Sequence, residues 1–231
     1  SLTQQFNNGL RYVDIRCRHY NDELLIFHGI VPQKANFDDV LTATATFLDT
    51  HPKEVVFMRV AEEYKPENNT KTFAQAVQSY VDRFPAKIFY RGKGYPAMGE
   101  ARGKLVVLRD YGGPANFGLV YGELDIEDKW QIDDLSKEEI QKKWNAVRSH
   151  LEKAKQGPTS TMYLTYSSGA GIFASPDDVA DRLNKLLVGY VSGSRAKWGM
   201  IAMDFPDAKL ISNIVNSNFN VSLFPKLNVC Y

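Results

Sequence analysis

The sequence predicts an α/β fold, a parallel (β/α) barrel from which one strand is absent. Short apolar runs of strand length alternate with longer amphipathic stretches along the chain, an order typical of parallel sheets. The 231 residues fit one large domain over 1–231, because barrels of this class reach this length without splitting. Seven strand-like runs are present, whereas a closed (β/α)₈ barrel needs eight.

The predicted elements follow in order along the chain. The strands, each rich in Val, Ile, Leu, Tyr or Met, are Leu10–Arg18, Glu23–His28, Glu54–Val60, Lys104–Asp110, Leu124–Trp130, Thr161–Tyr166 and Gly199–Asp204. The helices between them are Asn36–Thr50, Thr70–Phe84, Ser136–Lys155, Asp177–Val191 and Asp207–Asn216. Ser136 with Glu139 indicates a capping box, and Pro176 indicates a helix start. The chain opens in a helix-like stretch, so we expect the missing strand to lie before residue 1.

A doubly wound open sheet is the rival fold. No glycine-rich phosphate fingerprint follows any predicted strand, which disfavours it. Composition narrows the function classes: 44% hydrophobic and 24% charged residues are typical of a globular protein with a core. A net charge of +1 gives no reason to expect broad nucleic-acid affinity. No apolar run reaches the roughly 18 residues of a membrane-spanning helix.

Two cysteines, Cys17 and Cys230, are too few for a disulfide framework, and their spacing matches no zinc pattern. We expect reduced thiols. Sequons at Asn68 and Asn220 are weak indications of secretion, since such short matches arise by chance.

Candidate catalytic residues are sought at the carboxyl ends of the strands, where parallel barrels place their chemistry. Strand alternation puts Asp14, Arg16 and Arg18 on one face of the first strand. Charges facing a core are costly, so they indicate a polar site mouth, with a structural ion-pair lattice as the alternative. Guanidinium groups grip phosphate oxygens in a bidentate manner, which predicts an anionic substrate.

A histidine followed by glycine, His28-Gly29, ends the second predicted strand. By itself such a histidine is more often a core residue. The neighbouring strand supplies Arg16, and an imidazole beside a bound phosphate is a candidate general acid.

Other strand ends supply further candidates. Asp204 ends the last predicted strand, where it is expected either to orient a histidine or to cap the following helix. Arg59 and Glu63 end the third strand, and Asp128 and Trp130 end the fifth. Trp130 is read as either core or a stacking surface for a ring substrate. We expect His51 and His150 to be surface residues, and nothing clusters as a zinc site.

Several of these segments, taken together, resemble the bacterial phosphatidylinositol-specific phospholipases C, a class of phospholipase C-like phosphodiesterases that carry an X domain. The resemblance keeps the order and approximate spacing of the family over most of the chain. Its pieces are Gly9–Arg16, Leu25–Gly29, Pro52–Val60, Arg102–Leu108 and Met203–Pro206.

The resemblance implies a distorted TIM-type barrel and metal-independent cleavage by two histidines acting as base and acid. The inositol 2-hydroxyl attacks phosphorus and releases diacylglycerol and a cyclic inositol phosphate. By motif, His28 looks like the general acid and Arg16 like the phosphate clamp, with Asp14 as a supporting carboxylate. Asp204 looks like the partner of the general base, and Asp128 and Trp130 look like inositol contacts. Arg18, Arg59 and Glu63 are the remaining substrate-binding candidates.

The sequence departs from the family at two places. The general-base histidine has no counterpart, since no histidine precedes Asp14. Ala61 stands where the family often has a lysine, which weakens the prediction of strict inositol specificity. We therefore expect little activity from residues 1–231 alone and an upstream segment that supplies a histidine strand. A glycerophosphodiester-type phosphodiesterase and a noncatalytic phosphoinositide-binding module are the alternatives.

The resemblance also implies a partner and a location. The expected substrate is phosphatidylinositol or a related phospholipid at a membrane surface, bound without a transmembrane segment, a cofactor or nucleic acid. The family resemblance implies secretion.

Overall fold

The computed structural model describes residues 1–219 of the chain. The chain divides into two compact units between Leu124 and Asp125, and each unit is built around its own sheet. The prediction of one domain over residues 1–231 stays a prediction. Most of the predicted strands and helices are present, with bounds that differ by a few residues.

The first unit contains a six-stranded sheet with order β3-β2-β1-β4-β5-β6. Its strands are β1 (Tyr12–Tyr20), β2 (Glu23–His28), β3 (Val31–Asn36), β4 (Val55–Glu62), β5 (Lys104–Asp110) and β6 (Leu119–Val120). Its helices are α1 (Leu2–Asn7), α2 (Phe37–Thr50), α3 (Phe73–Val81) and α4 (Met98–Ala101), with short 3-10 turns η1 (Ala86–Ile88) and η2 (Tyr121–Glu123). Strands β3 and β6 were not predicted.

Strand β2 runs antiparallel to β1, so the prediction of a fully parallel arrangement is wrong for this strand. Only Asn21 and Asp22 separate the two strands, and a parallel crossover needs a dozen or more residues. Both residues have positive φ angles, 52° and 62°, as the tight turns of β-hairpins require. Strand β3 then pairs antiparallel with β2 and forms one edge of the sheet. It includes Pro32 and Lys34, and Lys34 has a φ of 56°.

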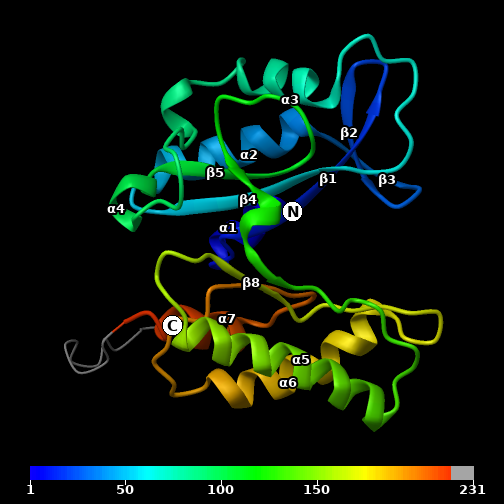
Figure 1. The fold of residues 1–231 in the computed structure, drawn as a ribbon, viewed down its shortest axis with the longest axis vertical. Coiled ribbons are helices and arrows are strands. Elements are labelled where there is room, and N and C mark those ends of the chain that lie inside the picture. The colour runs from blue at the N-terminus through cyan, green and yellow to red at the C-terminus, as the bar shows by residue number, and fades with distance from the viewer. Residues whose placement is uncertain (220–231) are drawn as a thin grey trace. The chain divides into compact units, whose positions relative to one another are not determined.

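Helices α2 and α3 lie over one face of this sheet (Figure 1). Alternate residues of β1, namely Val13, Ile15 and Cys17, are buried against them, while the residues between face the other way. Each helix begins at a capping box, Asn36 with Asp39 in α2 and Thr72 with Gln75 in α3. The predicted separation of an apolar and a charged face on β1 is confirmed.

The second unit contains a parallel three-stranded sheet with order β7-β8-β9. Its elements are β7 (Asp125–Glu127), α5 (Lys137–Gln156), β8 (Tyr163–Tyr166), α6 (Pro176–Val191), β9 (Met200–Ala202) and α7 (Ala208–Asn216). Pro176 opens α6, as predicted. Ser136 caps α5 by accepting a hydrogen bond from the Glu139 amide, but its own amide donates to Asp134 at 2.8 Å, so only half of the predicted capping box is present. Helices α5 and α6 lie side by side and share a core of Trp144, Val147, Leu183 and Leu187 (Figure 1).

Cys17 is a free, buried thiol, and burial raises the pKa of its thiol. Cys230 and the sequon at Asn220 lie outside the described residues. Within residues 1–219, every helix is too short or too polar to cross a lipid bilayer.

Candidate active site

The strand register of the first unit aligns charged residues on the face opposite to α2 and α3. Two successive rows read across β1, β4 and β5: Asp14, Arg59 and Leu108, then Arg16, Ala61 and Asp110. The second row lies one step nearer the carboxyl ends of the strands. Parallel α/β barrels place reactive groups at these ends, so the register assembles the predicted polar site mouth from three strands.

Ion pairs join the two rows. The Oδ2 atom of Asp14 accepts hydrogen bonds from Arg59 Nη1 at 2.9 Å and from Arg16 Nη2 at 3.2 Å. Arg59 also donates to Asp110 Oδ2, from Nε at 2.9 Å and from Nη2 at 2.5 Å. The Asp14 Oδ1 atom is buried and accepts no hydrogen bond from the described residues, so this carboxylate can take one more donor.

Arg16 is the more accessible arginine of the cluster, with a side chain 34% exposed against 14% for Arg59. Burial opposes its charge, but the attraction and hydrogen bond of Asp14 outweigh burial and raise the Arg16 pKa. Its second carboxylate neighbour, Glu63, lies 3.9 Å away. Arg16 is therefore a permanently charged group that solvent and a phosphate ligand can reach.

His28 ends β2 and is exposed, so the alternative of a core histidine is wrong. Glu63 accepts a hydrogen bond from the backbone amide of the next residue, Gly29, at 2.7 Å. Since Glu63 also faces Arg16, this bond ties the end of β2 to the arginine cluster. Gly29 has a φ of 60°, a conformation that a residue with a side chain adopts only under strain.

Arg18 shares a strand face with Asp14 and Arg16 but has different partners. It donates to Glu67 at 2.7 Å, and its guanidinium lies 5.0 to 5.6 Å from the centres of three aromatic rings: Tyr20, Phe27 and Tyr64. The structure brings together Asp14, Arg16, Arg59 and Glu63 and leaves Arg18 in an aromatic setting of its own. Its expected role in substrate binding stays a prediction.

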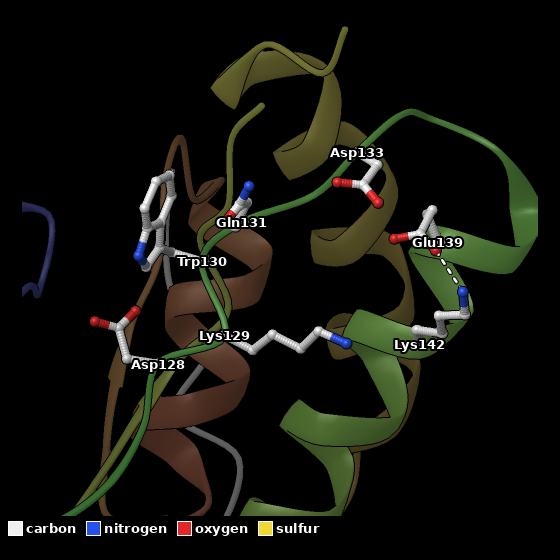
Figure 2. Close-up of a pocket in the computed structure, with 7 residues that line it drawn as sticks. All are labelled: Asp128, Lys129, Trp130, Gln131, Asp133, Glu139 and Lys142. Carbon is white, nitrogen blue, oxygen red and sulfur yellow. Dashed lines mark hydrogen bonds and ion pairs between the residues drawn. The ribbon is translucent and has the colours of Figure 1, made fainter. Parts of the chain in front are cut away.

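In the second unit, Asp128 and Trp130 lie on the loop after β7. Figure 2 shows them on one side of this loop, with Lys129 reaching toward Lys142 of α5 on the other side. The loop and the start of α5 line a polar groove of about 490 Å³. Trp130 is 57% exposed, so the alternative of a core tryptophan is wrong and its ring can contact a ligand.

Asp204 follows β9 and is half-buried. The cap of α7 is Asp207, whose side chain accepts a hydrogen bond from the Leu210 amide at 2.7 Å, so the capping alternative for Asp204 is wrong. The backbone carbonyl of Asp204 accepts a hydrogen bond from Asn184 of α6 at 2.9 Å, which fixes the start of this loop.

Comparison with known proteins shows what the chain is similar to. The model of "Phosphatidylinositol-specific phospholipase C, X domain" matches residues 1–111, which contain the arginine cluster and His28. Residues 1–111 are therefore similar to a phosphatidylinositol-specific phospholipase C X domain. A phosphodiesterase described as "1-phosphatidylinositol phosphodiesterase", from Listeria monocytogenes, is 25% identical over 94% of this chain and 71% of its own length. The mouse "PI-PLC X domain-containing protein 1" is 38% identical over 60 residues, which cover 25% of this chain and 17% of its own.

Solved structures extend the likeness beyond the X domain to the whole fold. The Listeria monocytogenes phosphatidylinositol-specific phospholipase C superposes with a TM-score of 0.82 and 24% identity, covering 95% of this chain and 82% of that one. The Staphylococcus aureus phospholipase C gives a TM-score of 0.80 and 23% identity, covering 94% and 83%. The fold is therefore the distorted TIM-type barrel of these bacterial phospholipases, as the resemblance implied.

Sequence reasoning missed two residues of the arginine cluster, Asp110 and Tyr121. Asp110 ends a predicted strand, so the strand-end rule that selected Arg59 could also have found it. Tyr121 offers no such signal, because it lies in η2 and reaches Arg59 only through the fold, with its ring 4.5 Å from the guanidinium.

His150 is buried, so its prediction as a surface residue is wrong. Its Nδ1 lies 2.8 Å from Thr165 Oγ1 and its Nε2 lies 3.2 Å from Asp125 Oδ1. Lys153 also binds Asp125, and the hydrogen bonds from Lys153 and His150 lower the pKa of that carboxyl. This set lies between α5 and the strands β7 and β8, outside the X domain.

Two further features of the second unit bear on binding. Ile172 and Phe173 are 93% and 78% exposed in the loop after β8. This loop is joined to Trp130 by a hydrogen bond from the Ala170 amide to the Trp130 carbonyl at 2.9 Å, so the three apolar side chains belong to paired segments.

No three acidic, histidine or cysteine side chains of residues 1–219 come together as metal ligands.

Proposed function

We propose that the chain is a phosphatidylinositol-specific phospholipase C. The observation that carries the proposal is the Asp14–Arg16 pair beside the β2 end that holds His28, all within the matched X domain. In this reaction the inositol 2-hydroxyl forms a bond to phosphorus, and the bond from phosphorus to the glycerol oxygen breaks. The products are diacylglycerol and a cyclic inositol phosphate.

Each residue of the site has a role that its position supports. Arg16 binds the phosphate oxygens and stabilises the charge that builds up on them. His28 protonates the leaving glycerol oxygen as general acid. Asp14 orients Arg16, and its Oδ1 is available to one further donor on substrate or enzyme. Glu63 fixes the turn after His28 through the Gly29 amide.

The remaining roles rest on the family resemblance. Asp204 is proposed as the partner of the general base, and Asp128 and Trp130 as contacts to the inositol ring. The exposed indole of Trp130 supports a stacking role, because a sugar-like ring packs well on an aromatic face.

The general base is proposed to come from outside residues 1–231. His19 is buried, His51 stacks on Phe47, and His150 is enclosed between α5 and its sheet, so none of them has an exposed ring beside Arg16. General acid and base groups each contribute about 10²–10⁴-fold to rate. Residues 1–231 alone are therefore expected to turn over slowly, and a form extended by a histidine-bearing strand is expected to turn over fast.

The test compares these two forms on phosphatidylinositol vesicles and on glycerophosphoinositol, each with and without a chelator. The proposal predicts chelator-resistant release of diacylglycerol, higher in the extended form and lost in Arg16→Ala. Chelator-sensitive cleavage of glycerophosphoinositol would identify a glycerophosphodiester-type enzyme instead. Vesicle binding without turnover in both forms would identify a noncatalytic phosphoinositide-binding module, a reading that Ala61 favours.

We further propose that the enzyme works at a membrane surface, outside the cell. The exposed side chains of Ile172, Phe173 and Trp130 support contact with lipid, because burying a large apolar side chain is worth about 1.5–3 kcal/mol. One of the similar Staphylococcus aureus structures is described as "Modulation of S.aureus Phosphatidylinositol-Specific Phospholipase C Membrane Binding". Secretion is tested by locating the tagged full-length protein in culture medium or in cells.

Replacing Ile172 and Phe173 together by alanine is predicted to weaken sedimentation with phosphatidylinositol vesicles by at least about tenfold, given the apolar area lost. Cleavage of soluble glycerophosphoinositol should be unchanged. The control is Leu186→Ala, an exposed apolar residue on α6. Equal vesicle binding by the double variant and the wild type would contradict the assignment of this loop.

A further inference from the structure

Arg59 uses its guanidinium differently from a ligand-binding arginine. Three of its N–H groups point to carboxylate oxygens, two to Asp110 and one to Asp14. One face of the group lies 4.5 Å from the centre of the Tyr121 ring. The side chain is only 14% exposed. A guanidinium has five donors in a fixed plane, so this one is largely occupied before any substrate arrives.

The Asp14 carboxylate connects Arg59 to the catalytic arginine. Its Oδ2 atom accepts the shorter bond from Arg59, 2.9 Å, and the longer bond from Arg16, 3.2 Å. Arg16 is more exposed than Arg59 and has one other described ion-pair contact, the 3.9 Å approach to Glu63. The orientation of the Arg16 guanidinium is therefore set mainly by the Asp14 carboxylate, which Arg59 holds in place.

We propose that Arg59, anchored by Asp110 and Tyr121, is a positioning residue that fixes the Asp14 carboxylate and through it aims Arg16 at the phosphate. Arg59 then acts through Asp14 and Arg16 and does not itself contact substrate. The proposal rests on the phospholipase function proposed above. It replaces the sequence-based prediction of Arg59 as a substrate contact, and it gives Asp110 and Tyr121 a role.

The strand register explains why Arg59 can bridge both rows. In the row nearer the strand ends, the small side chain of Ala61 stands between Arg16 and Asp110. Arg59 belongs to the row below, and its long side chain extends upward to reach Asp110. A large side chain at position 61 would occupy the space between Arg16 and Asp110, so the alanine and the bridging arginine fit together.

A purely structural lattice is the competing interpretation, and the chain contains a matched control for it. Arg11 also binds a carboxylate, Glu54, at 2.8 Å and lies over an aromatic ring, that of Phe47, at 4.6 Å. This pair has the same chemistry as the Arg59 cluster but lies at the amino-terminal side of β1 and β4. Arg11→Lys therefore reports the cost of losing a carboxylate-paired, ring-stacked arginine without touching the site.

The experiment compares Arg59→Lys, Asp110→Asn and Arg11→Lys in two measurements. The first is steady-state cleavage of phosphatidylinositol by the more active of the two forms assayed above. For Arg59→Lys we expect kcat and kcat/KM to fall together by up to about 100-fold, the cost of misplacing a reacting group by an ångström. For Asp110→Asn we expect a smaller fall in kcat and kcat/KM, because Arg59 keeps its bond to Asp14. Arg11→Lys should lower the melting temperature and leave kcat unchanged.

The second measurement needs no turnover. The Nε–H signal of Arg16 is followed by NMR in arginine-labelled residues 1–231, assigned with Arg16→Lys, and titrated with inorganic phosphate. The signal and its phosphate-dependent shift should change in Arg59→Lys and Asp110→Asn and persist in Arg11→Lys. An unaltered Arg16 signal in both site variants would overturn the proposal, as would a raised KM with unchanged kcat in Arg59→Lys. An altered signal in a protein that does not cleave phosphatidylinositol would support the positioning role and refute the proposed function.

Discussion

Each unit contains a cluster of hydrogen-bonded polar side chains. The two clusters differ in which face of their own sheet they occupy. In the first unit the cluster of Asp14, Arg16, Arg59 and Asp110 lies on the face that α2 and α3 leave uncovered. In the second unit His150 of α5 links Thr165 and Asp125, on the face that α5 covers. Hydroxyl, imidazole and carboxylate in a line imitate a catalytic triad.

The two clusters differ in whether a helix covers them. Thr165 is fully buried and His150 is 7% exposed, so no substrate reaches them. Such a set satisfies the polar groups of a helix–sheet interface, since buried donors and acceptors are costly when unpaired. The arginine cluster remains one-third exposed at Arg16 and ends beside an exposed histidine. Residue type alone therefore does not identify a site, and the side of the sheet does.

The largest effect that follows from this comparison is at His28. His28→Ala is predicted to lower the rate of phosphatidylinositol cleavage by about 10²–10⁴-fold through loss of the general acid. The melting temperature should hardly change, because the side chain is exposed. A substrate with a more acidic leaving group, such as a nitrophenyl inositol phosphodiester, should recover much of the rate. Equal loss on both substrates would contradict the acid role.

The matched change in the second unit should affect stability and not rate. His150→Ala leaves the Thr165 hydroxyl and one Asp125 oxygen without their imidazole partner, which is predicted to cost about 1–3 kcal/mol of unfolding free energy. The measurement is urea denaturation with parallel kinetics. Adding Thr165→Val should recover part of the loss, since it removes the orphaned hydroxyl. A large fall in kcat with unchanged stability would contradict the structural role assigned to His150.

An effect that only a change of pH reveals concerns Lys143 of α5, which is 1% exposed and donates to the Tyr166 carbonyl at 2.6 Å. Burial lowers its pKa from 10.5 to about 8. Between these pH values the unfolded chain binds one more proton than the folded chain at this residue. The contribution of Lys143 to stability therefore rises with pH across this window.

Lys143→Met should remove this rise. The difference in unfolding free energy between the variant and the wild type is expected to change by up to about 3 kcal/mol across the window, the equivalent of the pKa shift. The neighbouring Lys142, half-exposed and paired with Glu139, is the control. Its hydrogen bonds to Glu139 and Glu138 raise its pKa, opposite to the shift of Lys143, so Lys142→Met should keep the rise in stability across this window. Parallel pH profiles for Lys143→Met and the wild type would show that the buried amine does not titrate in this range.

Much of the first unit could be predicted from sequence because its signals are local. Alternation on β1 correctly assigned Asp14 and Arg16 to one face, and the strand-end rule selected Arg59 and Glu63. The antiparallel course of β2 was also readable, since the two residues Asn21 and Asp22 leave no room for a crossover. The general alternation of strands and helices favours a parallel order, and for this strand it conflicts with the local signal of the short turn.

Contacts between distant segments could not be predicted. The buried position of His150 depends on which face of a lysine-rich helix meets the sheet, and the many charges of α5 concealed its apolar stripe. Tyr121 meets Arg59 only because β5 and η2 fold back beside β4. That Arg59 is bound by two carboxylates is likewise a product of strand register, which a single sequence does not specify.

The edge strand β3 has a consequence for the behaviour of the protein in solution. A free sheet edge is a template for pairing with other chains and so for aggregation. Pro32 has no backbone N–H to offer such a partner, and the left-handed backbone at Lys34 interrupts the extended strand with a charge. The outermost strand of this sheet thus disfavours self-association, and concentrated solutions of the chain should stay free of intermolecular β-structure along this edge.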